Sequence, residues 1–282
     1  METVFKSVGL VARYDKKQAL KLVEELAEYL RSKNLKVYIE DTLTGKVNVP
    51  EKTVPLAKMK TDFIITIGGD GTILRACVAI PKPEPPILAL NMGVRGFLTE
   101  AQPKEACAAV ERCLKGELKI EKCAKLAVST SEGAIPDALN DIVVSAGEPS
   151  KILYTRILKD DKPLLKCQAD GLIVSTQTGS TGYSLSAGGP VLDPEVGAFV
   201  LTPICSLTVF RSLVFPADSK VTIQAIRPKC MLVLVDGNHR QLVKSKNPAL
   251  TVTCSKNVTS FIRFKDDFYH RLRSRLLFKG MG

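Results

Sequence analysis

The sequence predicts an α/β plus β fold: an N-terminal doubly wound α/β lobe with a parallel sheet, then a C-terminal lobe resembling a β-sandwich. The chain has 282 residues, more than the roughly 100–200 that one core usually holds. Strand-like and helix-like segments alternate in the first third, and short β-branched runs recur from about residue 119. We expect an α/β lobe over 1–118, a β-rich lobe over 119–264, and a segment over 265–282 that packs back on the α/β lobe.

The α/β lobe is predicted from an ordered series of segments. Residues 8–13 and 35–40 are short apolar, β-rich runs. Between them, residues 16–33 carry Leu20, Val23, Ala27 and Leu30 at the three-to-four spacing of an amphipathic helix. The run DFIITIGGDGTILRACVAI then passes from a buried strand through glycines into a helix, and PPILALNMG supplies a further strand. Successive strand–helix units predict a parallel sheet with crossover helices.

The second lobe is predicted from β-branched runs that turn residues separate at nearly regular intervals. These runs are KLAVST, ALNDIVVS, ILYTRILK, GLIVST, KVTIQAI, MLVLVDG, ALTVTC and SFIRF. The segment 178–189 is instead expected to be a loop leading into a short helix. Phe268, Leu272 and Leu276 recur every four residues and predict a helix over 268–277. We expect the two lobes to leave a cleft that holds the active site.

Composition excludes several classes of protein. No window approaches the roughly 18 apolar residues of a membrane helix, and the N-terminus lacks a secretory pattern, so we expect a cytoplasmic protein without a membrane partner. The net charge of +11 is explained either by a solvated basic surface or by attraction of polyanions. No aromatic–basic repeat supports a nucleic acid partner. Eight cysteines form no CxxC pair and there are two histidines, so we expect no zinc site and reduced, mostly buried thiols.

Two glycine-rich stretches each follow an apolar strand. In the first, GGDGT at 68–72, glycines and a helix N-terminus suit phosphate binding; the alternative is a simple strand-to-helix turn with Asp70 as N-cap. It matches neither a P-loop nor a dinucleotide fingerprint. The second, 175–186, concentrates hydroxyl groups that suit ribose or phosphate oxygens, or form an ordinary Ser/Thr-rich turn.

Polar residues inside apolar runs are further candidates. Asn140 and Asp141 interrupt a strand-like run, and Asp170 precedes another; burying such groups is costly unless they are hydrogen-bonded. Each forms either a turn or a contact with ribose hydroxyls. Asp236-Gly237-Asn238 favours a hairpin turn over a ligand contact, because Asp-Gly is typical of tight turns.

Five motifs occur in the order found in NAD kinases, which the chain resembles over essentially its full length. They are GGDGT at 68–72, NMGVRGFLTE at 91–100, LND at 139–141, DGLIVSTQTGSTGYSLSAGGPVL at 170–192 and DGN at 236–238. GGDGT is shared with 6-phosphofructokinases and with diacylglycerol and sphingosine kinases. The long TGST-containing stretch is far more specific to the NAD kinase family.

The resemblance implies a phosphotransferase with an alcohol acceptor: phosphorylation of the adenosine-ribose 2′-hydroxyl of NAD, giving NADP, with ATP or polyphosphate and a divalent metal cation, expected to be Mg²⁺. It also implies a homo-oligomer, a dimer or tetramer. Asp70 matches the family's proposed base, and Gly68, Gly69, Gly71 and Thr72 form the phosphate-donor loop. The residues that match substrate contacts are Gly71, Arg75, Phe97, Asn140, Asp141, Lys151, Gln168, Asp170, Thr181, Gly182, Tyr183, Ser184, Ser186 and Asn238. The sequence assigns no metal ligands.

Two alternative functions remain at this point. A lipid kinase of the diacylglycerol type would share GGDGT but would not need the ribose-binding TGST loop. A non-catalytic dinucleotide sensor would bind NAD through the same loops and show no turnover.

Overall fold

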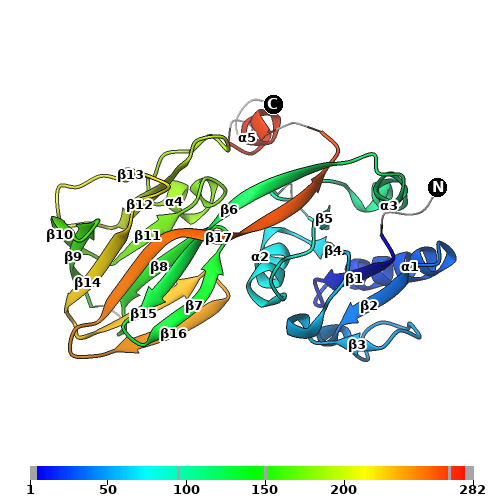
Figure 1. Ribbon diagram of the computed structural model, residues 1–282, viewed down its shortest axis with the longest axis horizontal. Helices are drawn as coiled ribbons and strands as arrows, with labels where there is room; N and C mark the ends of the chain where they lie inside the picture. The colour runs from blue at the N-terminus through cyan, green and yellow to red at the C-terminus, as the bar shows by residue number, and fades with distance from the viewer. Residues whose placement is uncertain (1–4, 94–95, 149–150, 266–267, 277–282) are drawn as a thin grey trace. The chain divides into compact units, whose positions relative to one another are not determined.

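The computed structural model describes residues 5–93, 96–148, 151–265 and 268–276. The chain divides into two compact units, one made of residues 1–122 and 259–282 and the other of residues 123–258 (Figure 1). The chain passes from the first unit to the second within strand β6 (Lys119–Thr130) and returns within strand β17 (Ala249–Arg263).

The first unit contains a parallel sheet, which confirms the predicted α/β class. Its strands follow the order β5-β4-β1-β2-β3, and the end of β17 pairs parallel to β5 at Phe261 and Ile87. The strands are β1 (Ser7–Ala12), β2 (Lys36–Glu40), β3 (Thr53–Val54), β4 (Phe63–Gly68) and β5 (Ile87–Asn91). The helices are α1 (Lys17–Ser32), α2 (Asp70–Ala79), α3 (Ala106–Leu114) and α5 (Phe268–Leu276).

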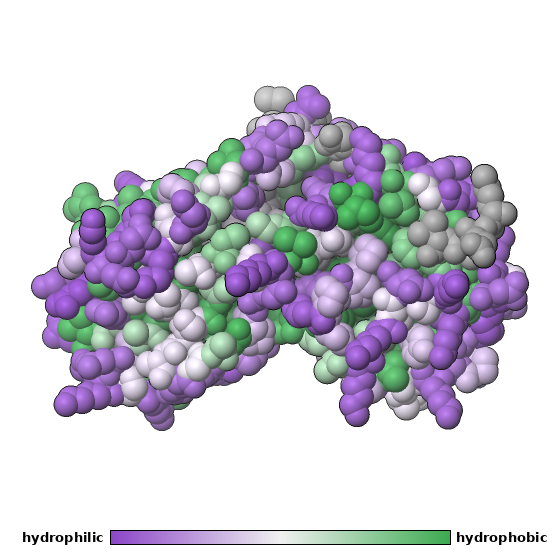
Figure 2. Space-filling model, in the orientation of Figure 1, coloured by the Kyte–Doolittle hydropathy of each residue, from purple (hydrophilic) through white to green (hydrophobic). Residues whose placement is uncertain are grey.

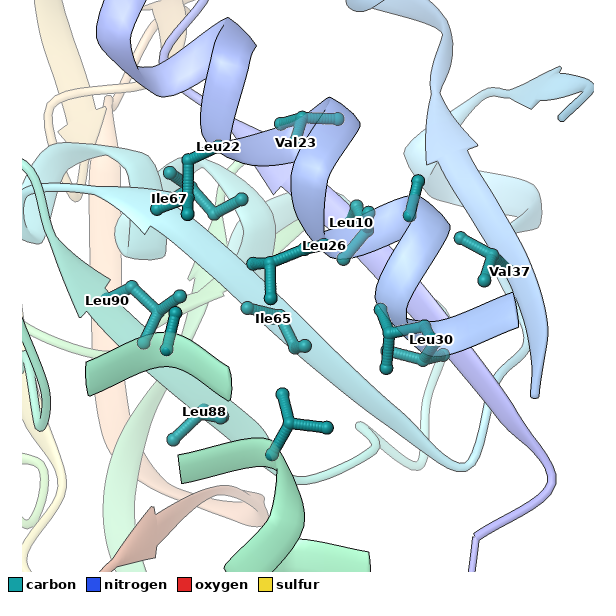
Figure 3. Packing of buried hydrophobic residues seen from close by; sticks show 14 of the residues in the cluster. Leu10, Leu22, Val23, Leu26, Leu30, Val37, Ile65, Ile67, Leu88 and Leu90 are labelled. Carbon is teal, nitrogen blue, oxygen red and sulfur yellow. The ribbon is translucent and has the colours of Figure 1, made fainter. Parts of the chain in front are cut away.

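The core of this unit covers both faces of the sheet. Leu26 and Leu30 of α1 belong to the same buried cluster as Leu10 and Ile65 of the strands (Figure 3). The alternate strand residues Val11, Ile64 and Ala89 point to the opposite face and are equally buried. On that side α2 contacts β1 and β4. Burial on both faces explains why these strands are apolar throughout rather than alternating.

The second unit is a sandwich of two sheets, as predicted. One is a six-stranded antiparallel sheet in the order β13-β12-β11-β8-β15-β16; in the other, the strands run β10-β9-β14-β17, and β6 pairs with β17 and β7. Apolar residues of both sheets form one core cluster. The strands are β7 (Gly133–Ala138), β8 (Asp141–Ala146), β9 (Leu153–Lys159), β10 (Lys162–Ala169), β11 (Gly171–Ser175), β12 (Ala198–Ile204), β13 (Leu213–Pro216), β14 (Val221–Arg227), β15 (Cys230–Val235) and β16 (His239–Lys244).

Several elements differ from the prediction. The runs ALTVTC and SFIRF belong to one long strand, β17, because the polar residues between them keep an extended backbone. The run ALNDIVVS is broken after Ala138, and Asp141 begins β8. Strands β3, β7, β10, β12, β13 and β16 and helix α3 were not predicted. The predicted loop and short helix at 178–189 are confirmed as a 3₁₀ turn, Gly179–Thr181, and α4 (Tyr183–Ser186). The predicted C-terminal helix is α5, although residue 277 lies outside the described residues.

The cysteines are less buried than expected. All eight are thiols rather than disulfides; Cys77, Cys113 and Cys167 are buried, whereas Cys107, Cys205 and Cys254 are exposed. The exposed ones lie on α3, after β12 and on β17. Within the described ranges, no helix has the length and apolar character needed to cross a membrane. The face of the molecule shown in Figure 2 carries mostly hydrophilic side chains, with apolar residues in small groups.

Candidate functional site

The GGDGT turn joins β4 to α2. Gly69 is the residue before the helix and adopts an extended backbone, and Asp70 is the first helical residue. A Cβ on Gly68 would overlap the side chain of Thr72, so the turn closes tightly on itself. A Cβ on Gly69 or Gly71 would meet no atom of the described residues within 4 Å. The N-terminus of α2 is therefore open on its glycine side and offers main-chain N–H groups and a partial positive charge to an anion.

The carboxylate of Asp70 is fixed by the loop that follows β5. Oδ2 accepts a hydrogen bond from the N–H of Phe97 at 3.0 Å, and Oδ1 accepts one from the N–H of Leu98 at 3.2 Å. A Cβ on Gly96 would overlap this carboxylate. The N-cap interpretation of Asp70 is thus wrong: Gly69 is the N-cap residue, and the carboxylate of Asp70 accepts hydrogen bonds from a different loop. The phenyl ring of Phe97 is itself buried. Residues 94 and 95 of the NMGVRGFLTE motif lie outside the described residues.

Arg75, on the second turn of α2, forms an internal ion pair. Its Nη2 donates to Oε1 of Glu40 at 2.8 Å and to the carbonyl oxygen of Ala12 at 3.1 Å. The side chain of Glu40 is fully buried and also accepts a hydrogen bond from Thr42. This pair ties α2 to the ends of β1 and β2, so Arg75 positions the helix that carries Asp70. Its contact with substrate stays a prediction.

In the second unit, Asn140 and Asp141 lie at the turn between β7 and β8. The carboxylate of Asp236 accepts hydrogen bonds from the N–H groups of Leu139 at 2.7 Å, Asn140 at 2.8 Å and Asp141 at 3.0 Å. Asp236 and Gly237 have φ values of 49° and 67° and form the turn between β15 and β16. The hairpin interpretation of DGN is confirmed. The sequence reasoning missed Asp236 as the residue that holds the Asn140–Asp141 turn.

The hydroxyl-rich loop packs against the same turn. The hydroxyl of Thr176 donates to the carbonyl oxygen of Leu139 at 2.6 Å, and the N–H of Thr176 donates to that of Asn140 at 2.9 Å. A Cβ on Gly179 would overlap the carbonyl of Asn140. A Cβ on Gly182 would lie 3.9 Å from both Asn140 Nδ2 and Asp141 Oδ2. The structure therefore brings together the side chains of Asn140 and Asp141 with the glycines of the TGSTGY segment.

The hydroxyls of this loop divide into two groups. Thr181 donates to the carbonyl oxygen of Thr178 at 3.1 Å, and Ser184 shares a buried hydrogen bond with Thr202 at 2.8 Å. The hydroxyls of Thr181 and Ser184 therefore hold the loop together. Tyr183 and Ser186 are exposed, with 47% of Tyr183 accessible. Tyr183 and Ser186 are therefore better placed to contact a ligand than Thr181 and Ser184.

Other predicted ligands lie farther from the turn. Asp141 pairs with Ser175 at one end of β11, and Gly171 pairs with Ser145 at the other end. Asp170 and Gln168 precede Gly171, so they lie beyond that far end, about 14 Å from the turn at roughly 3.4 Å per residue. Both are exposed, as is Lys151 before β9. The exposed Asn238 donates from Nδ2 to the carbonyl oxygen of Asp236 at 2.7 Å.

Burial makes the turn electrostatically unusual. It raises the pKa of Asp141 to about 7, and the nearby Asp236 carboxylate acts in the same direction. Burial also raises the pKa of Asp236, against the opposing effects of its three main-chain hydrogen bonds and the charge of Lys125. Asn140 Oδ1 and Ser175 Oγ are buried and find no hydrogen-bond partner among the described residues. Buried polar atoms without partners point to a bound molecule or water at this position.

Comparison with known proteins identifies the family. The family model for the ATP-NAD kinase N-terminal domain matches residues 8–118, and that for the C-terminal domain matches residues 139–264. An NAD kinase from Methanothermobacter thermautotrophicus is 35% identical over 277 residues, 97% of each chain. One from Thermococcus gammatolerans is 39% identical over 275 residues, 95% of this chain and 98% of the relative.

Solved structures give the same result. The crystal structure of yeast NADH kinase complexed with NADH superposes with a TM-score of 0.88 at 25% identity and covers 99% of this chain and 89% of its own. An Archaeoglobus fulgidus NAD kinase in complex with ATP superposes with a TM-score of 0.79 at 27% identity, covering 95% of this chain and 99% of its own. None of these findings supports the lipid-kinase or sensor alternative. The chain belongs to the NAD kinase family.

Proposed function

We propose that this protein phosphorylates the adenosine-ribose 2′-hydroxyl of NAD, with ATP or polyphosphate as donor, to give NADP. The observation that carries the proposal is the Asp70 carboxylate, held by two main-chain N–H groups at the open N-terminus of α2. Membership in the NAD kinase family supports the choice of substrate. The named relatives are NAD kinases, and the two solved structures contain NADH and ATP.

The donor is assigned to the GGDGT turn. Glycine at positions 69 and 71 lets phosphate oxygens approach the main chain without meeting a Cβ. The first turn of α2 supplies N–H groups that have no partner within the helix, and the helix dipole favours negative charge there. Arg75 contributes indirectly by holding α2 against Glu40.

NAD is assigned to the turn that carries Asn140 and Asp141. A carboxyl and an amide on adjacent residues offer acceptors and donors for paired ribose hydroxyls. The unpartnered Asn140 Oδ1 supports a ligand there. Tyr183 and Ser186, both exposed, are proposed to contact the dinucleotide as well. Lys151, Gln168, Asp170 and Asn238 remain proposed contacts from the resemblance, and Phe97 acts through its main chain.

The reaction consists of one displacement at phosphorus. The ribose 2′-oxygen forms a bond to the terminal phosphorus of the donor while the bridging P–O bond breaks, and ADP or the shortened polyphosphate leaves. Asp70 accepts the hydroxyl proton and passes it to water. Its two oxygens accept the N–H groups of Phe97 and Leu98, which fixes the direction in which the carboxylate meets the hydroxyl. Because phosphoryl transfer has a loose transition state, alignment contributes more than base strength.

The metal is proposed to arrive with the donor. Across the described ranges, no three His, Cys, Asp or Glu side chains cluster in a way that would hold a metal ion. Mg²⁺ commonly keeps several waters and binds substrate phosphates rather than a protein cage. The residues of the GGDGT turn therefore fit the magnesium complex of ATP or polyphosphate as the substrate. The resemblance further leads us to propose a cytoplasmic homo-oligomer, a dimer or tetramer, that requires neither nucleic acid nor a membrane.

The proposal is tested by incubating the purified protein with NAD, Mg²⁺ and either ATP or polyphosphate, then measuring NADP with an enzyme specific for it. NADH replaces NAD in a parallel reaction to identify the acceptor. Reactions without donor and with excess EDTA are the controls, and both should give no NADP. Phosphorylation of diacylglycerol in vesicles without NADP formation would indicate the lipid kinase. Binding of NAD without product from either donor would indicate a sensor.

A further inference from the structure

Asp236 is a buried carboxylate outside the set of predicted ligands. It lies in the turn between β15 and β16, is 3% exposed and adopts a φ of 49°. A non-glycine residue with positive φ is uncommon, and a buried carboxylate is costly unless it is hydrogen-bonded. The positive φ is what an Asp-Gly hairpin turn requires at both central residues. The burial of the carboxylate is not required by the hairpin and needs a reason of its own.

The reason lies in its hydrogen bonds. The two carboxylate oxygens of Asp236 accept hydrogen bonds from the N–H groups of Leu139, Asn140 and Asp141, at 2.7, 2.8 and 3.0 Å. Its own N–H donates to the carbonyl oxygen of Asp141 at 2.9 Å. Three consecutive N–H groups thus converge on one negative charge, and hydrogen bonds to a charged acceptor are about twice as strong as neutral ones.

The opposite side of the same turn is held by Thr176. Its hydroxyl and N–H donate to the carbonyl oxygens of Leu139 and Asn140, and Gly179 packs directly on the Asn140 carbonyl. The main chain of the turn is therefore fixed on both sides. The side chains of Asn140 and Asp141 are left to meet a ligand, and Asn140 Oδ1 has no partner among the described residues.

We propose that Asp236 is a positioning residue for NAD: it sets the main chain of the Asn140–Asp141 turn and thereby the direction in which the two side chains meet the dinucleotide. This inference rests on the proposed function, because it takes those side chains as NAD contacts. Asp236 itself does not touch substrate in this proposal. It acts through the turn, as an outer residue that orients ligand-binding groups.

The test compares Asp236→Asn with a matched variant, Asp160→Asn. Asp160 also lies in a hairpin turn with positive φ, 50°, and accepts one main-chain N–H from a distant residue, that of Lys220 at 2.9 Å. The hydrogen-bond partners of Asp160 are Lys159 and Lys220, which belong to a different turn from 139–141. Asparagine keeps the size of the side chain but replaces one acceptor oxygen with an NH₂ donor. At position 236 this NH₂ group would face the main-chain N–H groups of the turn, which are donors as well.

Four quantities are measured for each variant: amide hydrogen exchange at 139–141, the Kd for NAD by titration calorimetry, the KM for NAD and the KM for ATP. For Asp236→Asn we expect faster exchange at 139–141, a Kd and KM for NAD raised at least about tenfold, and a KM for ATP within about twofold of wild type, since one lost hydrogen bond to a charged group corresponds to roughly this factor. Asp160→Asn should leave all of these within twofold.

An unchanged Kd for NAD in folded Asp236→Asn, with faster exchange at 139–141, would overturn the inference. So would an equal loss of affinity for NAD and ATP, which indicates a general structural defect. If Asp236→Asn does not fold, Thr176→Val releases the same turn from its carbonyl side and is judged by the same criteria. Failure of the proposed function can be told apart from failure of this inference. If the proposed function is wrong, the wild-type protein forms no NADP, but the Kd for NAD measured by calorimetry still tests whether Asp236 positions the turn.

Discussion

Gly96 lies directly against the carboxylate of Asp70, so that a Cβ at position 96 would overlap Oδ1. The next two residues, Phe97 and Leu98, donate their N–H groups to the same carboxylate at 3.0 and 3.2 Å. The loop after β5 and the first turn of α2 are therefore fitted to each other at this point. The placement of Asp70 depends on a residue that has no functional group of its own.

Gly96→Ala should displace Asp70 and lower kcat by roughly 10- to 100-fold, because a misplacement of about 1 Å costs this much in aligned reactions. The KM for NAD should change little, since the Asn140–Asp141 turn to which NAD is assigned lies in the other unit. Gly93→Ala is the control in the same loop, where the new Cβ would have Lys16 Nζ at 4.0 Å as its nearest described atom. Steady-state kinetics of both variants measure the effect; equal kcat values for the two would contradict the prediction.

Asp70→Asn should lower kcat by roughly 10²- to 10⁴-fold, the usual contribution of a positioned proton acceptor, with a modest change in NAD affinity. The matched control is Asp62→Asn. Asp62 also accepts two main-chain N–H groups, those of Lys6 and Ser7 at 2.7 and 2.8 Å, but it lies away from the GGDGT turn. Initial rates of NADP formation provide the measurement. Retention of more than a tenth of wild-type turnover by Asp70→Asn would remove this residue from the proposed role.

Gly179→Ala should lower the free energy of unfolding by about 1–3 kcal/mol, the typical cost of overpacking, because the new Cβ would overlap the main-chain carbonyl of Asn140. A main-chain atom held by Asp236 and Thr176 cannot move aside cheaply. Gly197→Ala is the control, since a Cβ there meets no described atom within 4 Å. Chemical denaturation of both variants measures the difference. A Gly179→Ala protein as stable as Gly197→Ala would show that the turn at Asn140 adapts.

Asp141→Asn should change the pH dependence of stability. Burial raises the pKa of Asp141 to about 7 in the folded protein, from its ordinary value of 3.8. Between these two pH values, Asp141 holds a proton in the folded state and has lost it in the unfolded state. The free energy of unfolding contributed by this group therefore falls as the pH rises from about 4 to about 7. The stability of Asp141→Asn relative to wild type should rise over this range and level off above it. Denaturation curves at several pH values give the measurement.

The control for this titration is Asp160→Asn. The pKa of Asp160 is lowered, chiefly by its hydrogen bond with Lys159, so Asp160 stays ionised between pH 5 and 8. The difference between Asp160→Asn and wild type should be constant over that interval. NAD affinity provides a second readout: if ionised Asp141 accepts two ribose hydroxyls, wild-type affinity should rise from pH 6 to 8 and that of Asp141→Asn should stay flat. A wild-type affinity independent of pH would contradict this assignment.

Periodicity and turn chemistry were sufficient to predict most of the fold. The spacing of Val23, Ala27 and Leu30 predicted α1, and the glycines after the apolar run at 63–68 located the junction with α2. These signals are local: each depends on residues within one element. Among the strands that were missed, β12 begins with a continuous run of buried residues, β13 has four residues and β16 is mostly polar, so none shows a clear apolar alternation in the sequence. A turn at Asn140 and Asp141 was one of the two predicted interpretations, but what holds it could not be predicted, because Asp236 lies nearly a hundred residues farther along the chain.

The motifs, their order and the overall class of fold were thus determined by the sequence itself, since glycine tolerance, hydrophobic periodicity and the identity of polar groups are properties of neighbouring residues. The direction of each functional side chain was decided only by the tertiary structure. Asp70 turns toward Phe97 and Leu98 instead of capping its helix, and Asp236 gathers three N–H groups of a distant turn. The reason is that a carboxylate inside the fold, whether half-buried as in Asp70 or buried as in Asp236, takes whichever donors the packed chain brings within about 3 Å, and no local pattern specifies those donors.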